Sequence, residues 1–283
     1  MSRKALLVYN PSAGTAMVPE LWLGRVIHRL NSSLVDQTLV LTTSPEMTSA
    51  DILTELDKDI EILVAAGGDG TIRLALEAAA RSEFDPAVAI IPVGTGNQLA
   101  RNLGICDDAL INIDPLEKAI RALLGGHRQK IDLGIMNGNY FAVAAGAGPM
   151  SDAIVTPEQI NKINWKMLAY VSSLVQTLTR APVVFDIVAD GESFRVAASG
   201  LFVTNIADFG VGSLSETAKL NDGLLDLVIL APTEFQDYLE LGFAFAGASI
   251  GEEASYYIKK VREVSVDVLP LSRRQSVVEG TVR

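Results

Sequence analysis

Short apolar runs in the first half of the chain alternate with glycine-containing polar loops and with helical patterns. The clearest runs cover Ala5–Tyr9, Ile60–Ala66 and Val88–Pro92, each about the length of one strand. Near-continuous apolar runs are typical of strands that are buried on both faces of a sheet. A helical pattern follows the second run at Thr71–Arg81. Strands that alternate with helices predict a parallel sheet covered by helices, so we expect an α/β domain over residues 1–125.

The second half of the chain has the pattern of an antiparallel β domain. The dipeptides Asn137-Gly138 and Asp190-Gly191 each stand between two strand-like runs. Both dipeptides favour the positive-φ turn of a tight β-hairpin. Helical patterns occur at residues 162–178 and 234–245. We therefore expect an antiparallel β-sandwich with two helical insertions over residues 126–283.

Composition and charge exclude several classes of protein. The chain has 23 Lys+Arg against 34 Asp+Glu and a formal net charge of −11. This balance argues against a nucleic-acid partner, because neutralising phosphates requires clustered cations. One cysteine, Cys106, excludes a disulfide framework and fits a reducing compartment, so we expect a cytoplasmic protein. No apolar stretch has the length that a spanning helix needs, so we expect no transmembrane segment.

A five-residue loop, Gly67-Gly68-Asp69-Gly70-Thr71, follows a buried apolar run and precedes a helical pattern. Glycines let backbone N–H groups approach an anion, and a helix N-terminus adds a favourable dipole. Thr71 can give a hydroxyl to a phosphate, and Asp69 can hold a cation or its waters. A tight turn with a helix-capping aspartate would explain the same residues, but the complete pattern in this context favours phosphate binding.

Two further polar loops follow predicted strands of the same sheet. They are Gly94-Thr95-Gly96-Asn97 and Asn10-Pro11-Ser12-Ala13-Gly14. In parallel sheets ligands bind beyond the carboxyl ends of the strands, where these loops are expected to converge. Each loop alone is explained as a turn, but together they match what a nucleoside triphosphate site requires.

This ordered set of loops resembles the diacylglycerol kinase catalytic domain, whose family includes soluble bacterial lipid kinases and sphingosine and ceramide kinases. The likeness rests on Asn-Pro-x-x-Gly, Gly-Gly-Asp-Gly-Thr and Gly-Thr-Gly-Asn after successive predicted strands. It continues into the second domain, so it covers nearly the whole chain. The segments that carry it there are Ile131–Gly134, Ala145–Gly148 and Lys219–Asp226.

The resemblance implies ATP-dependent phosphorylation of a lipid hydroxyl, with ATP and Mg²⁺ as cofactors. The lipid, such as diacylglycerol or a sphingoid or isoprenoid alcohol, would be presented at a membrane surface, and a homodimer is left open. Thr43 is an implied nucleotide contact, although a helix cap would explain it equally well. The residues implied to bind the nucleotide are Asn10, Pro11, Ser12, Ala13, Gly14, Thr43, Gly67, Gly68, Asp69, Gly70, Thr71, Gly94, Thr95 and Asn97.

The resemblance also implies a structural Mg²⁺ beside the Asp-Gly-x-Leu-Asp turn of the second domain. Its ligands would be the Asp222 carboxylate and the main-chain carbonyl groups of Lys219 and Leu224, and Asp132 would join through a water molecule. Oxygen ligands of this kind suit Mg²⁺, which also keeps several waters. The alternative for Asp222-Gly223 is a hairpin turn without a metal ion.

Two acidic residues are implied to be catalytic, Asp69 in the glycine loop and Glu279 near the C-terminus. Glu279 stands where the family carries the aspartate of an Asp-Gly-Glu motif, and it would accept the lipid hydroxyl proton. The chain departs from the family at Thr281, which replaces a glutamate, and at Gln98, which replaces an aspartate. Two alternatives stay open: an NAD kinase-like enzyme, and a non-catalytic lipid- or nucleotide-binding protein on the same scaffold.

Overall fold

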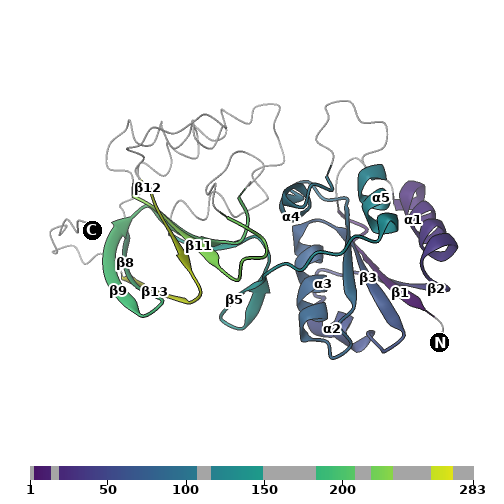
Figure 1. Cartoon of the computed structure of the whole chain (residues 1–283), viewed down its shortest axis with the longest axis horizontal. Coiled ribbons are helices and arrows are strands. Elements are labelled where there is room, and N and C mark those ends of the chain that lie inside the picture. Colours follow the sequence, from purple (N-terminus) through teal and green to yellow (C-terminus); the bar gives the residue numbers. More distant parts are fainter. Residues whose placement is uncertain are drawn as a thin grey trace. The chain divides into compact units, whose positions relative to one another are not determined.

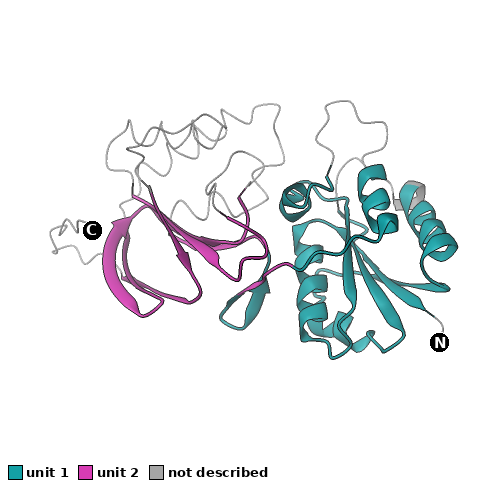
Figure 2. Ribbon diagram, viewed as in Figure 1, with its two compact units in different colours: residues 1–130, 135–142 teal, residues 131–134, 143–283 magenta. Residues whose placement is uncertain are grey.

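The computed structural model of this 283-residue chain describes residues 3–13, 19–106, 116–148, 183–207, 218–231 and 256–269. The chain forms two compact units, coloured separately in Figure 2. Unit 1 comprises Met1–Lys130 and Ile135–Ala142, and unit 2 comprises Ile131–Gly134 and Val143–Arg283. The helical insertions that we expect at residues 162–178 and 234–245 lie outside the described residues.

Unit 1 is built on a four-stranded parallel sheet with the strand order β2-β1-β3-β4. The α/β prediction for this part of the chain is therefore confirmed. The strands are β1 (Lys4–Tyr9), β2 (Gln37–Thr42), β3 (Ile60–Gly67) and β4 (Ala87–Pro92). The helices are α1 (Pro19–Ser33), α2 (Ser49–Thr54), α3 (Asp69–Arg81), α4 (Gln98–Asn102) and α5 (Glu117–Gly125).

Apolar side chains from both faces of this sheet form the core of unit 1. Successive side chains of a strand point to opposite faces, so Leu6 and Leu7 of β1 are both buried, on different sides. Leu7 belongs to a buried cluster that includes Trp22 of α1 and Ile120 of α5. Figure 1 shows α1 and α5 side by side, and α2 beside α3. Burial of both faces explains why the sequences of β1 and β3 are nearly continuous apolar runs.

Helix α5 is an element that sequence reasoning does not predict. It has nine residues and ends at Gly125, followed by Gly126 with φ +67° as the C-terminal cap. An isolated helix of this length is marginal in water, so packing must stabilise it. Leu116, Ala119 and Ile120 supply that packing, because all three are buried in the same cluster as β1 and β3.

Unit 2 is made of two antiparallel sheets, as the sequence predicts. One has the order β12-β11-β10-β7 and the other β13-β8-β9. The first sheet contains β7 (Ala144–Ala147), β10 (Gly200–Thr204), β11 (Leu225–Leu230) and β12 (Tyr256–Val261). The second contains β8 (Val183–Ala189), β9 (Glu192–Ala198) and β13 (Val264–Leu269).

Close packing between the two sheets surrounds Phe185 of β8, which is fully buried. A Cβ atom on Gly148, just after β7, would lie 3.0 Å from the ring of Phe185 and 3.2 Å from the Cα of Gly200. Gly148 also has φ +96°, so a side chain there would be strained as well as crowded. Glycine at this position therefore lets the sheets come together.

The two predicted hairpin turns are confirmed. Asn137 and Gly138 have φ of +51° and +82° between β5 (Gly134–Met136) and β6 (Asn139–Phe141). Asp190 and Gly191 have φ of +50° and +84° between β8 and β9. The Asp190 carboxylate also accepts the backbone N–H groups of Arg262 and Glu263, each at 2.9 Å, which joins this turn to the turn between β12 and β13.

Candidate functional site

The predicted phosphate loop lies at the carboxyl end of β3 and leads directly into α3. Gly68 caps the helix, whose first residue is Asp69, and the Ile72 N–H donates to the Gly68 carbonyl at 3.1 Å. A Cβ atom on Gly67 would lie 2.5 Å from the side chain of Thr71, which is buried. The strand–loop–helix context in which a glycine loop can present N–H groups to an anion is therefore present.

The second glycine loop, after β4, touches the first. A Cβ atom on Gly94 would lie 2.3 Å from the Cα of Gly68 and 2.9 Å from its nitrogen, so the two backbones pack directly on each other. Asn97 holds this loop in shape: it has φ +51°, and its side-chain Nδ2 donates to the Gly94 carbonyl at 2.7 Å. The predicted convergence of the two loops is confirmed.

Asp69 links the two loops through its carboxylate. The backbone N–H groups of Leu99, Gln98 and Asn97, at the start of α4, donate hydrogen bonds to it. Burial raises the pKa of the Asp69 carboxyl, and these hydrogen bonds oppose the rise without cancelling it. Among the described residues no hydrogen-bond partner reaches its buried Oδ1, nor the buried Oδ1 of Asn97. Asp69 therefore positions the second loop with one carboxylate oxygen, while its buried Oδ1 has no hydrogen-bond partner among the described residues.

The third predicted loop follows β1 at the same edge of the sheet. The Asn10 N–H donates to the Ala66 carbonyl at 3.0 Å, and Asn10 Oδ1 accepts the Ser12 N–H at 2.9 Å. The Ala13 N–H closes the turn on the Asn10 carbonyl at 3.2 Å. Pro11 lies within this turn, whereas Gly14 lies outside the described residues.

Thr43 comes directly after β2, and its N–H donates to the Tyr9 carbonyl at the end of β1. It is not the cap of the next helix, because α2 begins at Ser49 and its N-terminal cap is Thr48. The helix-cap alternative for Thr43 is therefore wrong, and the residue lies at the strand edge where the glycine loops also lie. Gly70 and Thr95, the other predicted nucleotide contacts, lie in those loops and are exposed.

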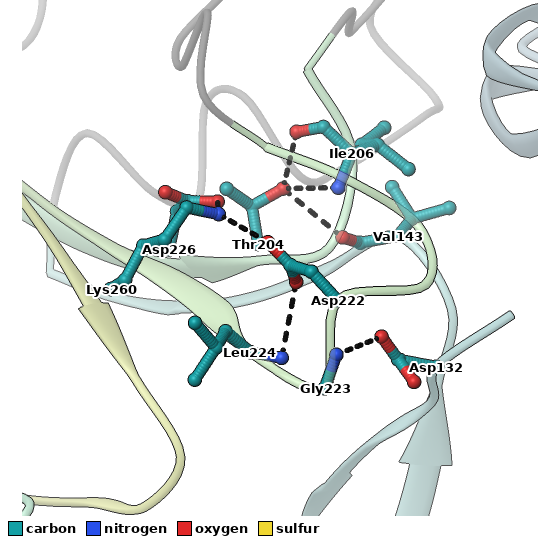
Figure 3. A network of polar contacts seen from close by, with 9 residues as sticks. All are labelled: Asp132, Val143, Thr204, Ile206, Asp222, Gly223, Leu224, Asp226 and Lys260. Atoms are coloured by element: carbon teal, nitrogen blue, oxygen red, sulfur yellow. Dashed lines mark hydrogen bonds and ion pairs between the residues drawn. The ribbon is translucent and has the colours of Figure 1, made fainter.

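The residues predicted to hold a structural metal ion come together in unit 2. The Asp132 carboxylate accepts the Gly223 N–H at 2.7 Å, and the Asp132 N–H donates to the Leu220 carbonyl at 2.6 Å. The Asp222 carboxylate accepts the Leu224 N–H at 3.1 Å (Figure 3). Lys219 opens the same segment, so Lys219, Asp222 and Leu224 share one turn before β11, and Asp132 contacts that turn.

Sequence reasoning misses two polar residues around this turn, Lys260 and Asn205. Lys260 of β12 donates to Asp222 Oδ2 at 2.8 Å, and its ammonium lies 3.6 Å from the buried carboxylate of Asp226 (Figure 3). The buried Asn205 donates its Nδ2 to the Asp132 carbonyl at 2.6 Å. No sequence signal finds these residues, because they meet only through the pairing of distant strands.

The other predicted site residues are not described. Glu279 and Thr281 lie outside the described ranges. Within the described ranges, no group of three or more His, Cys, Asp or Glu residues is arranged to hold a metal ion. None of the helices described there is both long and apolar enough to span a bilayer.

Two family models match the chain in succession. The model "Diacylglycerol kinase catalytic domain" matches residues 4–136, which contain the glycine loops. The model "YegS C-terminal NAD kinase beta sandwich-like domain" matches residues 142–278. The chain belongs to the diacylglycerol kinase catalytic-domain family. It is a lipid kinase, which confirms the class of enzyme that the loops predict.

Similar proteins match nearly the whole of this chain and most of their own length. A diacylglycerol kinase from Bacillus subtilis (strain 168) is 26% identical over 270 residues, 94% of this chain and 86% of the relative. A diacylglycerol kinase from Staphylococcus saprophyticus is 28% identical over 272 residues, 94% of this chain and 85% of the relative. A solved structure of a diacylglycerol kinase from Bacillus anthracis str. Sterne has a TM-score of 0.71 at 21% identity and covers 94% of this chain and 86% of its own. The last match shows that the two-domain fold is shared.

Proposed function

We propose that this lipid kinase transfers the γ-phosphoryl group of ATP to the hydroxyl of a lipid alcohol such as diacylglycerol or a sphingoid or isoprenoid alcohol. The observation that carries the proposal is the direct packing of Gly94 on Gly68, which brings two glycine loops together at the carboxyl edge of the parallel sheet. Ligands of such sheets bind at that edge, and glycine loops there suit phosphates. Family membership supplies the lipid kinase chemistry.

The phosphates would lie along the loops that begin at Gly67 and Gly94, and the Asn10 turn and Thr43 would contact the rest of the nucleotide. Glycine is required where the two loops meet, because at Gly94 a side chain would occupy space that the neighbouring backbone already fills. A site this close-packed orders its N–H groups before the ligand arrives. Phosphoryl transfer depends mainly on such positioning and on neutralising charge.

Mg²⁺ carried with ATP fits the crevice between these loops. The buried Oδ1 atoms of Asp69 and Asn97 have no hydrogen-bond partner among the described residues, and both are oxygens of the kind that Mg²⁺ prefers. These two residues would hold the ion or its waters. When bound, Mg²⁺ would neutralise charge on the phosphates.

Glu279 would accept the proton of the lipid hydroxyl as its oxygen attacks the γ-phosphorus. This proposal rests on the sequence position alone, where a carboxylate precedes a glycine as in the family motif. General-base assistance of this kind typically contributes about 10²–10⁴-fold to the rate. We propose further that the lipid is met at a membrane surface, from the cytoplasmic side.

The test is a product assay with γ-labelled ATP and Mg²⁺ on the full chain. Separate reactions contain diacylglycerol, sphingosine, ceramide, an isoprenoid alcohol in mixed micelles, or NAD. A labelled lipid phosphate in one of the lipid reactions supports the proposal and identifies the lipid acceptor. Labelled NADP without labelled lipid would transfer the assignment to an NAD kinase-like activity, and ATP binding without any product would indicate a binding protein.

A further inference from the structure

Lys260 lies between two carboxylates at the turn where the family resemblance implies a metal ion. It stands directly opposite Asp226 in the antiparallel pairing of β11 with β12. Its Nζ is 2.8 Å from Asp222 Oδ2 and 3.6 Å from Asp226 Oδ2. Figure 3 shows Lys260 beside both carboxylates. The ammonium therefore occupies the acidic side of this turn.

Both carboxylate oxygens of Asp222 and one of Asp132, which a divalent cation would need here, already have partners. Asp222 uses Oδ1 to accept the Leu224 N–H and Oδ2 to accept the Lys260 ammonium. Asp132 uses Oδ2 to accept the Gly223 N–H. Mg²⁺ requires near-octahedral oxygen ligands at about 2.0–2.1 Å, and beside Asp222 it would lie next to a positive charge. The residues as they lie do not fit the implied ion.

The burial of Asp226 explains why a positive charge is needed beside this turn. Asp226 is 1% exposed, and a buried carboxylate is costly unless a positive charge and hydrogen bonds compensate it. The hydrogen bond from Lys260 lowers the pKa of the Asp222 carboxyl against the opposing effect of burial. Burial acts to lower the pKa of Lys260, but Asp222 and Asp226 outweigh it, and the pKa is raised. The Lys260 ammonium therefore lies where it compensates the charge of both carboxylates.

We propose that the Lys260 ammonium takes the place of the structural divalent cation in this chain. It neutralises Asp222 and Asp226 and thereby fixes the turn from Lys219 to Asp226 on the sheet of unit 2. This contact joins the turn to the sheet, because Asp222 precedes β11 while Lys260 belongs to β12. Unit 2 then keeps its structure without divalent metal, whatever metal the nucleotide brings to unit 1.

The experiment compares thermal unfolding of the full chain with excess Mg²⁺ and with EDTA, both without nucleotide. Wild type should unfold at the same temperature in both, and the purified protein should contain no stoichiometric divalent metal. Lys260→Met should lower the unfolding temperature by about 4 °C or more, because two carboxylates lose their cation. Added Mg²⁺ should restore part of that loss in Lys260→Met, and not in the double variant Lys260→Met/Asp222→Asn.

Lys259 offers a matched control on the same strand. Its ammonium pairs with Glu192, whose side chain is 70% exposed, so the pair contributes little to stability. Lys259→Met should change the unfolding temperature by less than about 2 °C and should show no response to Mg²⁺.

Two results would overturn the proposal. A stoichiometric metal ion in wild type, with EDTA lowering its unfolding temperature, would show that a metal holds the turn. A Lys260→Met variant as stable as Lys259→Met would show that the ammonium does not stabilise it. If Lys260→Met does not fold in EDTA, the variant is refolded in excess Mg²⁺. Refolding there, with purified wild type free of stoichiometric metal, supports the proposal, and stoichiometric metal in wild type contradicts it.

Discussion

The backbone of Gly94 rests on the backbone of Gly68: a Cβ atom on Gly94 would lie 2.3 Å from the Gly68 Cα. The reverse contact is looser, because a Cβ atom on Gly68 would lie 3.5 Å from the Gly94 Cα. A methyl group is therefore tolerated on Gly68 but not on Gly94. This asymmetry gives a sharper test of the phosphate site than removal of any charged group.

Gly94→Ala should force the two loops apart and weaken ATP binding by about tenfold or more, equivalent to about 1.4 kcal/mol. The measurement is the dissociation constant of ATP by calorimetry. Gly24→Ala in α1 is the control, because nothing lies within 4 Å of its Cβ position. Equal ATP affinity of both variants and wild type would show that the loops do not cradle the phosphates.

Asp69→Asn should reduce kcat by about 10²–10³-fold while the fold is retained, because the variant loses the charge that faces the crevice. The N–H groups at the start of α4 would still find the amide oxygen as an acceptor. Turnover with γ-labelled ATP on the active lipid, alongside circular dichroism, measures both quantities. Turnover within a few-fold of wild type would remove Asp69 from the catalytic set.

Stability should also depend on pH through Asp69. Burial raises the pKa of its carboxyl above the ordinary value of 3.8, against the opposing hydrogen bonds from Leu99, Gln98 and Asn97. A carboxyl whose pKa is higher in the folded state than in the unfolded state stabilises the fold at pH values below its unfolded-state pKa. That stabilisation is lost as the pH rises through the folded-state pKa. Asp69→Asn should therefore gain stability relative to wild type from acid to neutral pH, as urea unfolding would show. A difference that stays constant with pH would contradict the buried, charged carboxylate.

Glu77→Gln should destabilise unit 1 by about 1–2 kcal/mol, because Glu77 is a buried carboxylate between two arginines. Arg73 and Arg81 approach it at 3.0 Å and 2.9 Å, and Arg81 also donates to the Gly138 carbonyl at 2.6 Å. The control is Glu117→Gln, which breaks an exposed pair with Arg121 worth about 0.5 kcal/mol or less. Urea unfolding of both variants makes the comparison, and equal losses would contradict a special role for Glu77.

Glu279→Gln should lower kcat by about 10²–10⁴-fold with little change in ATP affinity, because it keeps the shape but cannot take the proton. Glu279→Asp should retain much of the activity, since it keeps the carboxylate. Steady-state kinetics on the active lipid and nucleotide titrations test both variants. Wild-type turnover in the Gln variant would mean that another group, or none, serves as the base.

Local sequence determined the features whose physical cause is local. Asn137-Gly138 and Asp190-Gly191 adopt positive φ because those residue types tolerate the left-handed region that two-residue hairpins require. Glycine loops after apolar runs predicted the strand–loop–helix units, since buried parallel strands need apolar residues on both faces. The family followed from the order of these loops along the chain.

Tertiary structure decided the contacts between residues that are distant in the sequence. Asp69 was predicted to hold a cation, yet its carboxylate also receives the first N–H groups of α4, which only the packing of the two loops brings near. Lys260 carries no signal in the sequence, yet the register of β11 with β12 places it opposite Asp226. Charge pattern alone does not reveal such a pair, because its energy depends on burial and distance, and both are set by how the strands pair.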